Sequence, residues 1–326
     1  MSRITGPELA TGLDSLPAAP VLYLGGTQRS GSTLLDRMLS QIPGHVSAGE
    51  VVHLWTRGVR DNELCGCRAP FHRCPFWSEV GRVAFGGWHR IDVESIIALQ
   101  RSVDRNRYIF FMLFPILAPM YARKLRSYGW ALSQLLRAIA ACGGDVVVDS
   151  SKHASTAFLL RRVPGVRIRV VHLVRDSRGV AHSLGKRVRR PEVRTGEAFM
   201  HRQSPLRAAL EWSIFNGLFH LLRWFGTPTS RIRYEDLVSD PASTIQRAAA
   251  GSGGASSWRP RFIDGRTVTL NVDHTVAGNP MRFSHGRVEL RFDEAWRTEM
   301  SRLDRWMTTA LTAPMLISYG YRLRRS

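Results

Sequence analysis

Lysine is nearly absent from this 326-residue chain, and acidic residues are in the minority. Only Lys124, Lys152 and Lys186 are lysines, so arginine supplies almost all of the 46 basic residues. With 26 acidic residues, the formal net charge is +20. This arginine bias is typical of GC-rich coding sequence, so the charge favours anionic nucleotides, acidic substrates or membrane surfaces only weakly. No nucleic-acid-binding motif or disordered basic tail accompanies it, and we therefore expect no nucleic-acid partner.

The chain also lacks a long apolar run and a signal peptide. Residues 1–20 contain Glu8 and Asp14 and have no continuous apolar core. The most apolar run, residues 108–121 (YIFFMLFPILAPMY), is too short to span a bilayer and is interrupted by two prolines. We interpret it as a buried or subunit-facing segment. The alternatives are one wall of a pocket for an apolar acceptor and a contact with a membrane surface. We expect a soluble, cytoplasmic protein, and the sequence does not predict its oligomeric state.

Four cysteines are too few for a disulfide scaffold in a chain of this length. Three of them, Cys65, Cys67 and Cys74, cluster in CGCRAPFHRC with His72 nearby. Three thiols and an imidazole could bind zinc, but this spacing fits no common zinc pattern. We therefore expect reduced thiols or one local disulfide that hold an insertion at about residues 61–80 in shape. We predict no metal site and no role for these cysteines in the chemistry.

Apolar runs alternate with helical patterns along the chain. We predict strands at residues 21–24, 46–50, 146–149, 167–174 and 232–234. Predicted helices cover residues 30–41, 92–141 (with breaks at Pro115 and Pro119), 155–163 and 208–225, and others begin at Ser177 and Glu235. Residues 251–257 (GSGGASS) read as a surface loop. This order predicts an α/β fold in which a single doubly wound parallel sheet is flanked by helices. One P-loop-like domain would cover residues 1–326, with its core at about 20–300.

A glycine-rich loop, GGTQRSGST, follows the first predicted strand and opens a helix. It nearly matches the nucleoside-triphosphate loop G-x-x-x-x-G-K-[ST], but Ser32 occupies the lysine position. Backbone amides at a helix N-terminus bind anions, and Arg29 and the hydroxyl of Thr33 add donors. Neither Asp149 nor Asp176 ends a strand in a clear magnesium-binding pattern. We therefore predict a phosphate-type ligand that needs no magnesium.

Three further polar segments follow predicted strands: AGE at residues 48–50, DSSK at 149–152 and RDSR at 175–178. Ligands of parallel sheets bind beyond the carboxyl ends of the strands. The four segments together therefore predict one site at that edge of the sheet.

Three motifs, RSGST, VRDSRGVAHS (residues 174–183) and RYEDL (residues 233–237), together resemble the sulfotransferases that use 3′-phosphoadenosine 5′-phosphosulfate (PAPS). The resemblance covers about residues 20–300. It is greatest to the branch of protein-tyrosine and bacterial carbohydrate or natural-product sulfotransferases. It implies an enzyme of EC class 2.8.2, with the sulfotransferase fold. Such an enzyme transfers a sulfuryl group from PAPS to a hydroxyl of a small-molecule, carbohydrate or lipid acceptor, gives PAP, and requires no metal.

The resemblance also implies which residues bind the nucleotide. Arg29 replaces the lysine of phenol-type enzymes, and Ser177 stands where proline or glycine is common. The implied ligands of the 5′-phosphosulfate are Arg29, Ser30, Gly31, Ser32 and Thr33. Those of the 3′-phosphate are Arg175, Ser183 and Arg187. Tyr234 would contact the nucleotide, and a late loop with Gly278, Asn279 and Arg282 would close over it.

For the chemistry, Glu50 is the predicted general base, with His53 as the second candidate. A surface helix cap is the alternative role for Glu50. Lys152 would assist at the bridging oxygen or else pair with Asp149, and Arg29 would neutralise the developing charge. In the same way, residues 175–178 could be an exposed charge cluster at a helix start, and Tyr234 a core residue.

Two other functions remain open. One is a metal-dependent small-molecule kinase of the P-loop class, and the other is an inactive PAP- or nucleotide-binding module. We expect variable loops at residues 53–130 and 185–205 to shape the acceptor pocket, whose substrate the sequence does not identify.

Overall fold

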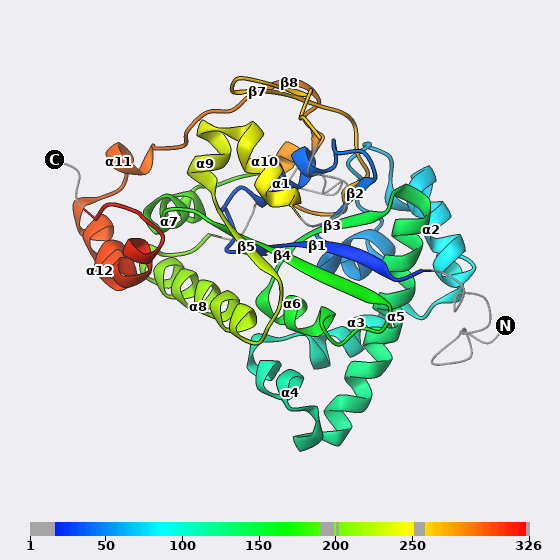
Figure 1. The fold of residues 1–326 in the computed structure, drawn as a ribbon. Helices are drawn as coiled ribbons and strands as arrows, with labels where there is room; N and C mark the ends of the chain where they lie inside the picture. Colours follow the sequence, from blue (N-terminus) through cyan, green and yellow to red (C-terminus); the bar gives the residue numbers. More distant parts are fainter. Residues whose placement is uncertain (1–16, 190–198, 200–201, 251–257, 324–326) are drawn as a thin grey trace.

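A five-stranded parallel sheet forms the centre of the fold (Figure 1). The computed structural model describes residues 17–189, 199, 202–250 and 258–323. The strand order is β2-β3-β1-β4-β5, and every neighbouring pair is parallel. The strands are β1 (Ala19–Gly26), β2 (His45–Gly49), β3 (Val146–Lys152), β4 (Val166–Val174) and β5 (Thr229–Arg233). The predicted α/β fold with a parallel sheet is confirmed.

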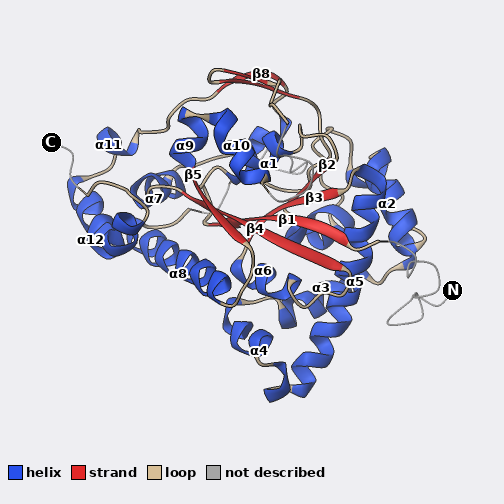
Figure 2. Ribbon diagram, in the orientation of Figure 1, coloured by secondary structure: helices blue, strands red, loops and turns tan. Residues whose placement is uncertain are grey.

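Helices cover both faces of the sheet, because β1 is apolar on both of its faces (Figure 2). Val21 and Tyr23 of β1 belong to one core, and Leu22 and Leu24 to another, as the alternation of a strand requires. The first core includes residues of α2 (Pro75–Phe85), α3 (Val93–Val103), α5 (Pro119–Gly143), α6 (Ala154–Leu160) and α8 (Pro205–Trp224). The second includes residues of α1 (Ser32–Leu39), α9 (Tyr234–Ser239) and α10 (Pro241–Ala249). A third core joins α7 (Ser177–Gly185) to α11 (Trp296–Glu299) and α12 (Arg302–Ser318).

The order of the strands creates a switch point at β1. From β1 the chain runs to β2 on one side of the sheet, returns through β3, and then crosses to β4 and β5 on the other side. Connections that leave neighbouring strands in opposite directions open a crevice at their carboxyl ends. The glycine-rich loop, which follows β1, lies at this crevice.

A second, antiparallel sheet lies apart from the first, near the top of Figure 1. It consists of β6 (Ile263–Asp264), β7 (Thr267–Leu270) and β8 (Gly286–Glu289). This small additional sheet was not predicted. Strands of two to four residues are too short to show the alternation that identifies a strand in sequence.

The predicted elements of the main sheet are present, with shifted ends. Tyr234, predicted to end a strand, instead begins α9, since β5 ends at Arg233. The predicted loop at residues 251–257 lies outside the described residues.

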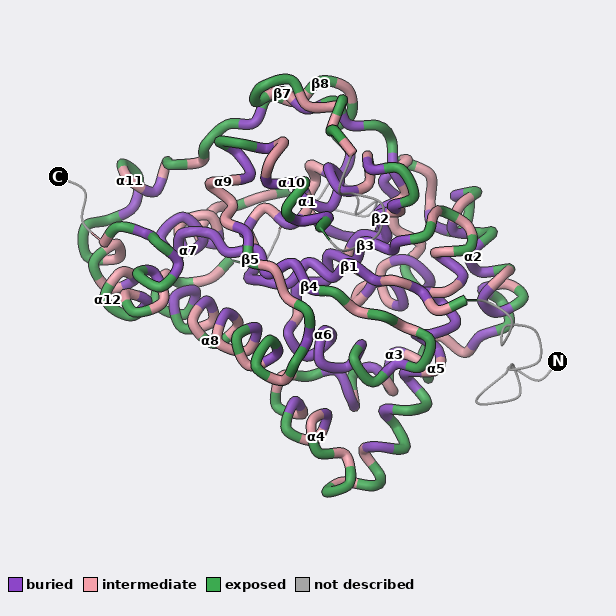
Figure 3. Tube along the Cα trace, in the orientation of Figure 1, coloured by how far each residue is buried: buried purple, intermediate pink, exposed green. Residues whose placement is uncertain are grey.

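Most of residues 108–121 lie outside the core, although Ile109 and Met112 are buried. They form α4 (Ile109–Leu113), a 3-10 turn (Pro115–Leu117) and the start of α5, at the lower tip of the fold in Figure 3. Ile116 is 85% exposed and Met120 is 80% exposed, so these residues are not part of the core of the chain. The interpretation as a subunit-facing segment stays a prediction. None of these residues lines the cavity described below, which also excludes them as its acceptor wall. Within the described part of the chain, no helix has the length and apolarity to cross a bilayer.

Candidate functional site

A cavity of about 570 Å³ lies at the carboxyl ends of β1, β3 and β4. It brings together twelve of the residues predicted from sequence. They are Arg29, Gly31, Ser32, Thr33, Glu50, His53, Lys152, Arg175, Ser183, Tyr234, Gly278 and Asn279.

The glycine-rich loop has one position at which the backbone conformation and the close neighbours allow only glycine. Gly31 has φ = 91° and occupies the N-cap of α1, where no side chain caps the first amides. A Cβ at Gly31 would lie 2.6 Å from the ring of Tyr234. Arg29 also has a positive φ of 63°, a strained conformation of the kind found at functional sites. The loop therefore presents uncapped helix amides to the cavity, while Tyr234 packs directly against it.

Ser30 supports the loop instead of lining the cavity. Its side chain is fully buried and donates a 2.7 Å hydrogen bond to the carbonyl of Thr27.

Two arginines from different motifs meet beside the loop. Arg175 Nη1 donates a 2.9 Å hydrogen bond to the carbonyl of Arg29, and its guanidinium lies 4.5 Å from the ring centroid of Tyr234. The Nε atom of Arg29 is buried, and no described residue accepts a hydrogen bond from it. Burial, and next the charge of Arg175, lower the pKa of Arg29 from its ordinary value. Two cations and an unused buried donor thus face a region that can accept an anion.

The carboxylate of Asp293 forms an ion pair with the guanidinium of Arg175. Its Oδ2 lies 3.0 Å from Arg175 Nη2. Burial alone would raise the pKa of Asp293, but the hydrogen bond and charge of Arg175 hold it below its ordinary value. A second anion that binds Arg175 would therefore compete with this carboxylate.

Glu50 and Lys152 form an ion pair inside the cavity, between the ends of β2 and β3. Lys152 Nζ lies 2.5 Å from Glu50 Oε1, and the two side chains are only 10% and 12% exposed. Burial would raise the pKa of Glu50, but Lys152, and then His53, lower it below the ordinary value. Glu50 makes no capping hydrogen bond, so the alternative of a surface helix cap was wrong.

Lys152 does not pair with Asp149, so that alternative was also wrong. Asp149 Oδ1 accepts hydrogen bonds from the backbone and hydroxyl of Ser151, at 2.9 and 2.5 Å. The N–H of Val51, two residues after the end of β2, lies 3.4 Å from the same oxygen. Burial raises the pKa of Asp149 to about 7. Asp149 therefore fixes the end of β3, from which the side chain of Lys152 reaches Glu50.

Two histidines stand next to this pair. His53 Nε2 lies 3.5 Å from Glu50 Oε2, and the rings of His53 and His153 meet edge to face with centroids 6.1 Å apart. Burial among the cavity walls lowers the pKa of His53 to about 4, although 37% of its side chain stays open to the cavity. Burial lowers the pKa of His153 as well. Both imidazoles are therefore neutral at neutral pH.

Sequence reasoning missed several residues of the cavity. His153 directly follows DSSK at a strand end, and this position was a signal that could have identified it. The others are Gln28, Leu34, Arg57, Phe199 and Met281. Arg57 and Phe199 come from the two regions predicted to shape the acceptor pocket.

The segment at residues 278–282 reaches the cavity through Gly278, Asn279 and Met281. A Cβ on Gly278 would lie 3.5 Å from Glu50 Oε1 and 3.6 Å from Thr33 Oγ1. The N–H of Asn279 donates to Thr33 Oγ1 at 3.4 Å. Arg282 points elsewhere, because its buried guanidinium donates to the carbonyls of Thr275 and Leu64. This geometry gives Arg282 a structural role in place of the predicted contact with the nucleotide.

Arg187 does not line the cavity. It is exposed, and its guanidinium lies 3.8 Å from the ring centroid of Phe199, which is a cavity residue.

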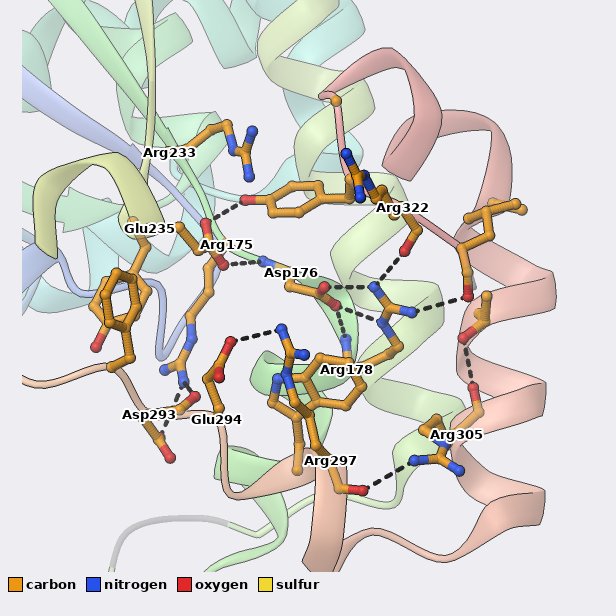
Figure 4. A pocket seen from close by; sticks show the side chains of 18 of the residues that line it. Arg175, Asp176, Arg178, Arg233, Glu235, Asp293, Glu294, Arg297, Arg305 and Arg322 are labelled. Carbon is orange, nitrogen blue, oxygen red and sulfur yellow. Dashed lines mark hydrogen bonds and ion pairs between the residues drawn. The ribbon is translucent and has the colours of Figure 1, made fainter. Parts of the chain in front are cut away.

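A larger cavity, of about 1170 Å³, lies on the other side of Arg175 and Tyr234, which line both cavities (Figure 4). Inside it, Arg178 Nη2 pairs with Asp176 Oδ2 at 2.6 Å, and Asp176 caps α7 by accepting from the N–H of Arg178. The prediction of an exposed charge cluster was therefore wrong for this pair, since both residues are buried. Arg175 turns away from them, toward Asp293 and the smaller cavity.

The cysteine cluster differs from the prediction in its histidine. His72 Nε2 lies 2.8 Å from the carbonyl of Val59. The imidazole beside Cys65, Cys67 and Cys74 belongs instead to His274, and all three cysteines are free thiols. His274 lies only four residues before Gly278. Through His274, the cluster is therefore linked to the segment that lines the cavity.

Comparison with known proteins gave structural matches only. No model of a protein family matches the chain, and no curated protein sequence matches it. The sulfotransferase domain of the Synechococcus PCC 7002 olefin synthase matches with 18% identity and a TM-score of 0.46, over 95% of this chain and 98% of that domain. The sulfotransferase domain from the curacin biosynthetic pathway matches with 16% identity and a TM-score of 0.45, over 95% and 99%. Sulfotransferase STF9 from Mycobacterium avium matches with 13% identity and a TM-score of 0.45, over 96% and 80%.

Proposed function

We propose that this chain is a single-domain sulfotransferase that moves the sulfuryl group of PAPS to a hydroxyl of an acceptor, giving PAP. The observation that carries the proposal is the buried, unpartnered Nε of Arg29 beside Arg175, at the uncapped start of α1. The meeting of the three sulfotransferase-like motifs supports it further. Arg175 bonds to the backbone of Arg29, and Tyr234 packs against both Gly31 and Arg175.

The residues present fit PAPS, which carries anionic groups at the 3′ and 5′ positions of its ribose. Arg29, Ser32 and Thr33 would hold the 5′-phosphosulfate together with the amides of α1. Arg175 and Ser183 would hold the 3′-phosphate, with Tyr234 between the two sites. Bound there, PAPS supplies the sulfuryl group and the PAP leaving group. We assign no nucleotide contact to Arg282, whose donors face backbone carbonyls.

In the reaction, the acceptor oxygen forms a bond to sulfur while the bond from sulfur to the bridging oxygen breaks. The electron pair of that bond stays with the phosphate, and the acceptor proton goes to a base. Glu50 is the proposed base, since its carboxylate is ionised and faces the cavity. Arg29 and Lys152 neutralise the negative charge, an electrostatic effect that dominates related transfers.

Lys152 links the action of the general base to the neutralisation of charge. Its ammonium has three donors, and the described contacts use two of them, to Glu50 and to the carbonyl of Ser150. As negative charge grows at the bridging oxygen, Lys152 is drawn toward it and away from Glu50. The main cause of the lowered pKa of Glu50 then weakens, and the carboxylate becomes a better base. His53, neutral and 3.5 Å from Glu50, is the second candidate for the base.

Binding of PAP tests the proposal. We expect PAP to bind in the presence of EDTA and to raise the melting temperature, because a ligand of the native state stabilises it by mass action. Turnover is tested by screening small-molecule, carbohydrate and lipid hydroxyl acceptors with PAPS that carries labelled sulfate.

The rival functions predict other results. A larger thermal shift with Mg-ATP than with PAP would favour the kinase. Tight PAP binding with no transfer to any acceptor would favour the inactive module.

A further inference from the structure

Three cysteines and one histidine converge beside the cavity, from segments about 200 residues apart. The ligand atoms of Cys65, Cys67, Cys74 and His274 all lie within 4.8 Å of one another. The Sγ atoms of Cys67 and Cys74 are 3.7 Å apart. His274 Nδ1 lies 3.2 Å from the Sγ of Cys74 and 3.8 Å from that of Cys65.

Two of these three separations, 3.7 and 3.8 Å, match the edges of a tetrahedral zinc site, and the third, 3.2 Å, is slightly shorter. Bonds of about 2.3 Å to sulfur and about 2.0–2.1 Å to nitrogen place neighbouring ligand atoms about 3.5–3.8 Å apart. A disulfide would need its two sulfurs at about 2.05 Å. Cys74 stands at the N-cap of α2, next to the positive end of that helix.

The surroundings hold each ligand in place. Gly66 separates the first two cysteines, and its N–H donates to the carbonyl of Thr275 at 3.0 Å. A Cβ there would lie 2.6 Å from Asp273 Oδ1, so only glycine allows this approach. Trp77 Nε1 donates to the carbonyl of His274 at 2.7 Å, and the ring of Phe76 stacks on that of His274.

We propose that Cys65, Cys67, Cys74 and His274 bind one structural Zn²⁺ ion, which fastens the insertion to the segment that borders the active site. Four protein ligands fill a tetrahedral zinc site and leave no open position for catalysis. The ion would hold the active site in shape through the residues that follow His274. The carbonyl of Val276 accepts from the N–H of Glu50 at 2.8 Å, and Gly278 lies against Glu50 and Thr33.

Metal analysis tests this site without reference to the proposed function. We expect about one zinc per chain in protein purified under reducing conditions without chelator. Substitution with Co²⁺ should give thiolate charge-transfer bands and tetrahedral d–d bands. Zinc far below one per chain that reconstitution does not restore, or a Cys67–Cys74 disulfide in the native protein, would overturn the proposal.

Variants identify the ligands. Cys74→Ser and His274→Gln should lose zinc and melt at lower temperature. The matched controls Cys142→Ser and His72→Gln should keep full zinc content. Loss of zinc from His72→Gln but not from His274→Gln would contradict the assignment. If the ligand variants fail to fold, the Co²⁺ spectrum of the unaltered chain still decides whether thiolates bind the metal.

A second, independent feature is the exposed apolar tip, defined here as residues 109–120. Phe110, Phe114, Ile116, Leu117 and Met120 are 43–85% exposed there. Scattered exposed apolar residues need no explanation, but a contiguous group indicates a binding surface.

The charge around the tip indicates which partner it fits. Residues 105–126 contain five basic residues and no acidic residue, and Arg105, Arg107, Arg123, Lys124 and Arg126 are all exposed. Each basic residue near an anionic bilayer contributes about 1 kcal/mol to binding. A second copy of the chain would instead bring like charges together. We infer that the tip inserts into the surface of an anionic membrane.

Vesicle co-sedimentation tests this inference. We expect binding to vesicles of phosphatidylglycerol and phosphatidylcholine, with little binding to phosphatidylcholine alone. The double variant Ile116→Ser/Met120→Ser should lose most of that binding. The matched variant Leu303→Ser/Trp306→Ser, on exposed apolar residues of α12, should retain it. Equal loss in both variants would overturn the inference, as would a dimer in solution that Ile116→Ser/Met120→Ser abolishes.

Discussion

Lys152 Nζ lies 2.5 Å from Glu50 Oε1, and this ion pair joins the ends of β2 and β3, which lie side by side in the sheet. Both residues were predicted to act in catalysis, but their pairing was not predicted. The pair explains how a buried carboxylate stays ionised, and it makes Glu50 and Lys152 interdependent.

Glu50→Gln separates catalysis from binding. Glutamine keeps the size of the side chain but cannot accept the proton. We expect kcat to fall on the order of 10²–10⁴-fold, with PAP affinity nearly unchanged. Turnover and calorimetry with PAP measure the two effects, and Glu94→Gln, on an exposed carboxylate, is the control. Full turnover, or loss of PAP binding, would exclude Glu50 as the base and leave His53 or Lys152.

Arg175→Ala should mainly weaken nucleotide binding. The substitution removes a charge-assisted contact to the 3′-phosphate that contributes about 1.5–3 kcal/mol. PAP affinity should fall by roughly one to two decades, while kcat at saturating PAPS changes less. Calorimetry should show unchanged affinity for Arg207→Ala, an exposed arginine on α8. If Arg175→Ala binds PAP as well as the unaltered chain does, the nucleotide site lies elsewhere.

Asp293→Asn should have the opposite effect on affinity. The carboxylate of Asp293 pairs with Arg175 and would compete with an incoming phosphate. We expect the variant to bind PAP more tightly, on the order of severalfold for one unfavourable charge near the ligand. Calorimetry at two salt concentrations should show a smaller gain at high salt. Weaker binding would mean that Asp293 positions Arg175 and does not compete with the ligand.

His172 should make the fold sensitive to acid. It is 2% exposed, and burial lowers its pKa to about 3 from an ordinary value of 6.5. Between these values the unfolded chain binds a proton that the native chain does not. Its contribution to stability is therefore complete above pH 6.5 and is lost as the pH falls toward 3. The slope for one group is at most about 1.4 kcal/mol per pH unit.

Urea unfolding across this pH range measures the effect. His172→Gln keeps a donor for Asn216 Oδ1, which lies 2.7 Å from the imidazole Nε2. It should reduce the pH dependence of the free energy of unfolding, whereas exposed His285→Gln should not. An unchanged slope in His172→Gln would assign the acid sensitivity to other groups.

Sequence by itself determined the loops that carry the predicted site residues and the parallel strands of the main sheet, but not their order. The apolar runs of β1, β3 and β4 and the glycine loop at residues 25–33 depend on neighbours in the chain. Local periodicity, and positions that require glycine such as Gly31 with its positive φ, can therefore be recognised in the sequence. The rule that ligands bind at strand ends then placed Arg29, Glu50, Lys152 and Arg175 in one region.

Only the tertiary structure decided which side chains meet. The partner of Lys152 is Glu50 and not Asp149, and the imidazole beside the cysteines is His274 and not His72. Arg282, predicted to contact the nucleotide, donates to backbone carbonyls instead. The apolar tip faces outward, which the sequence offered only as one of several possibilities. Contacts across 100 to 200 residues leave no periodic signal in the chain, because they depend on how separate elements pack. The sequence therefore specified the groups available at the site, and the packing of those elements specified their partners.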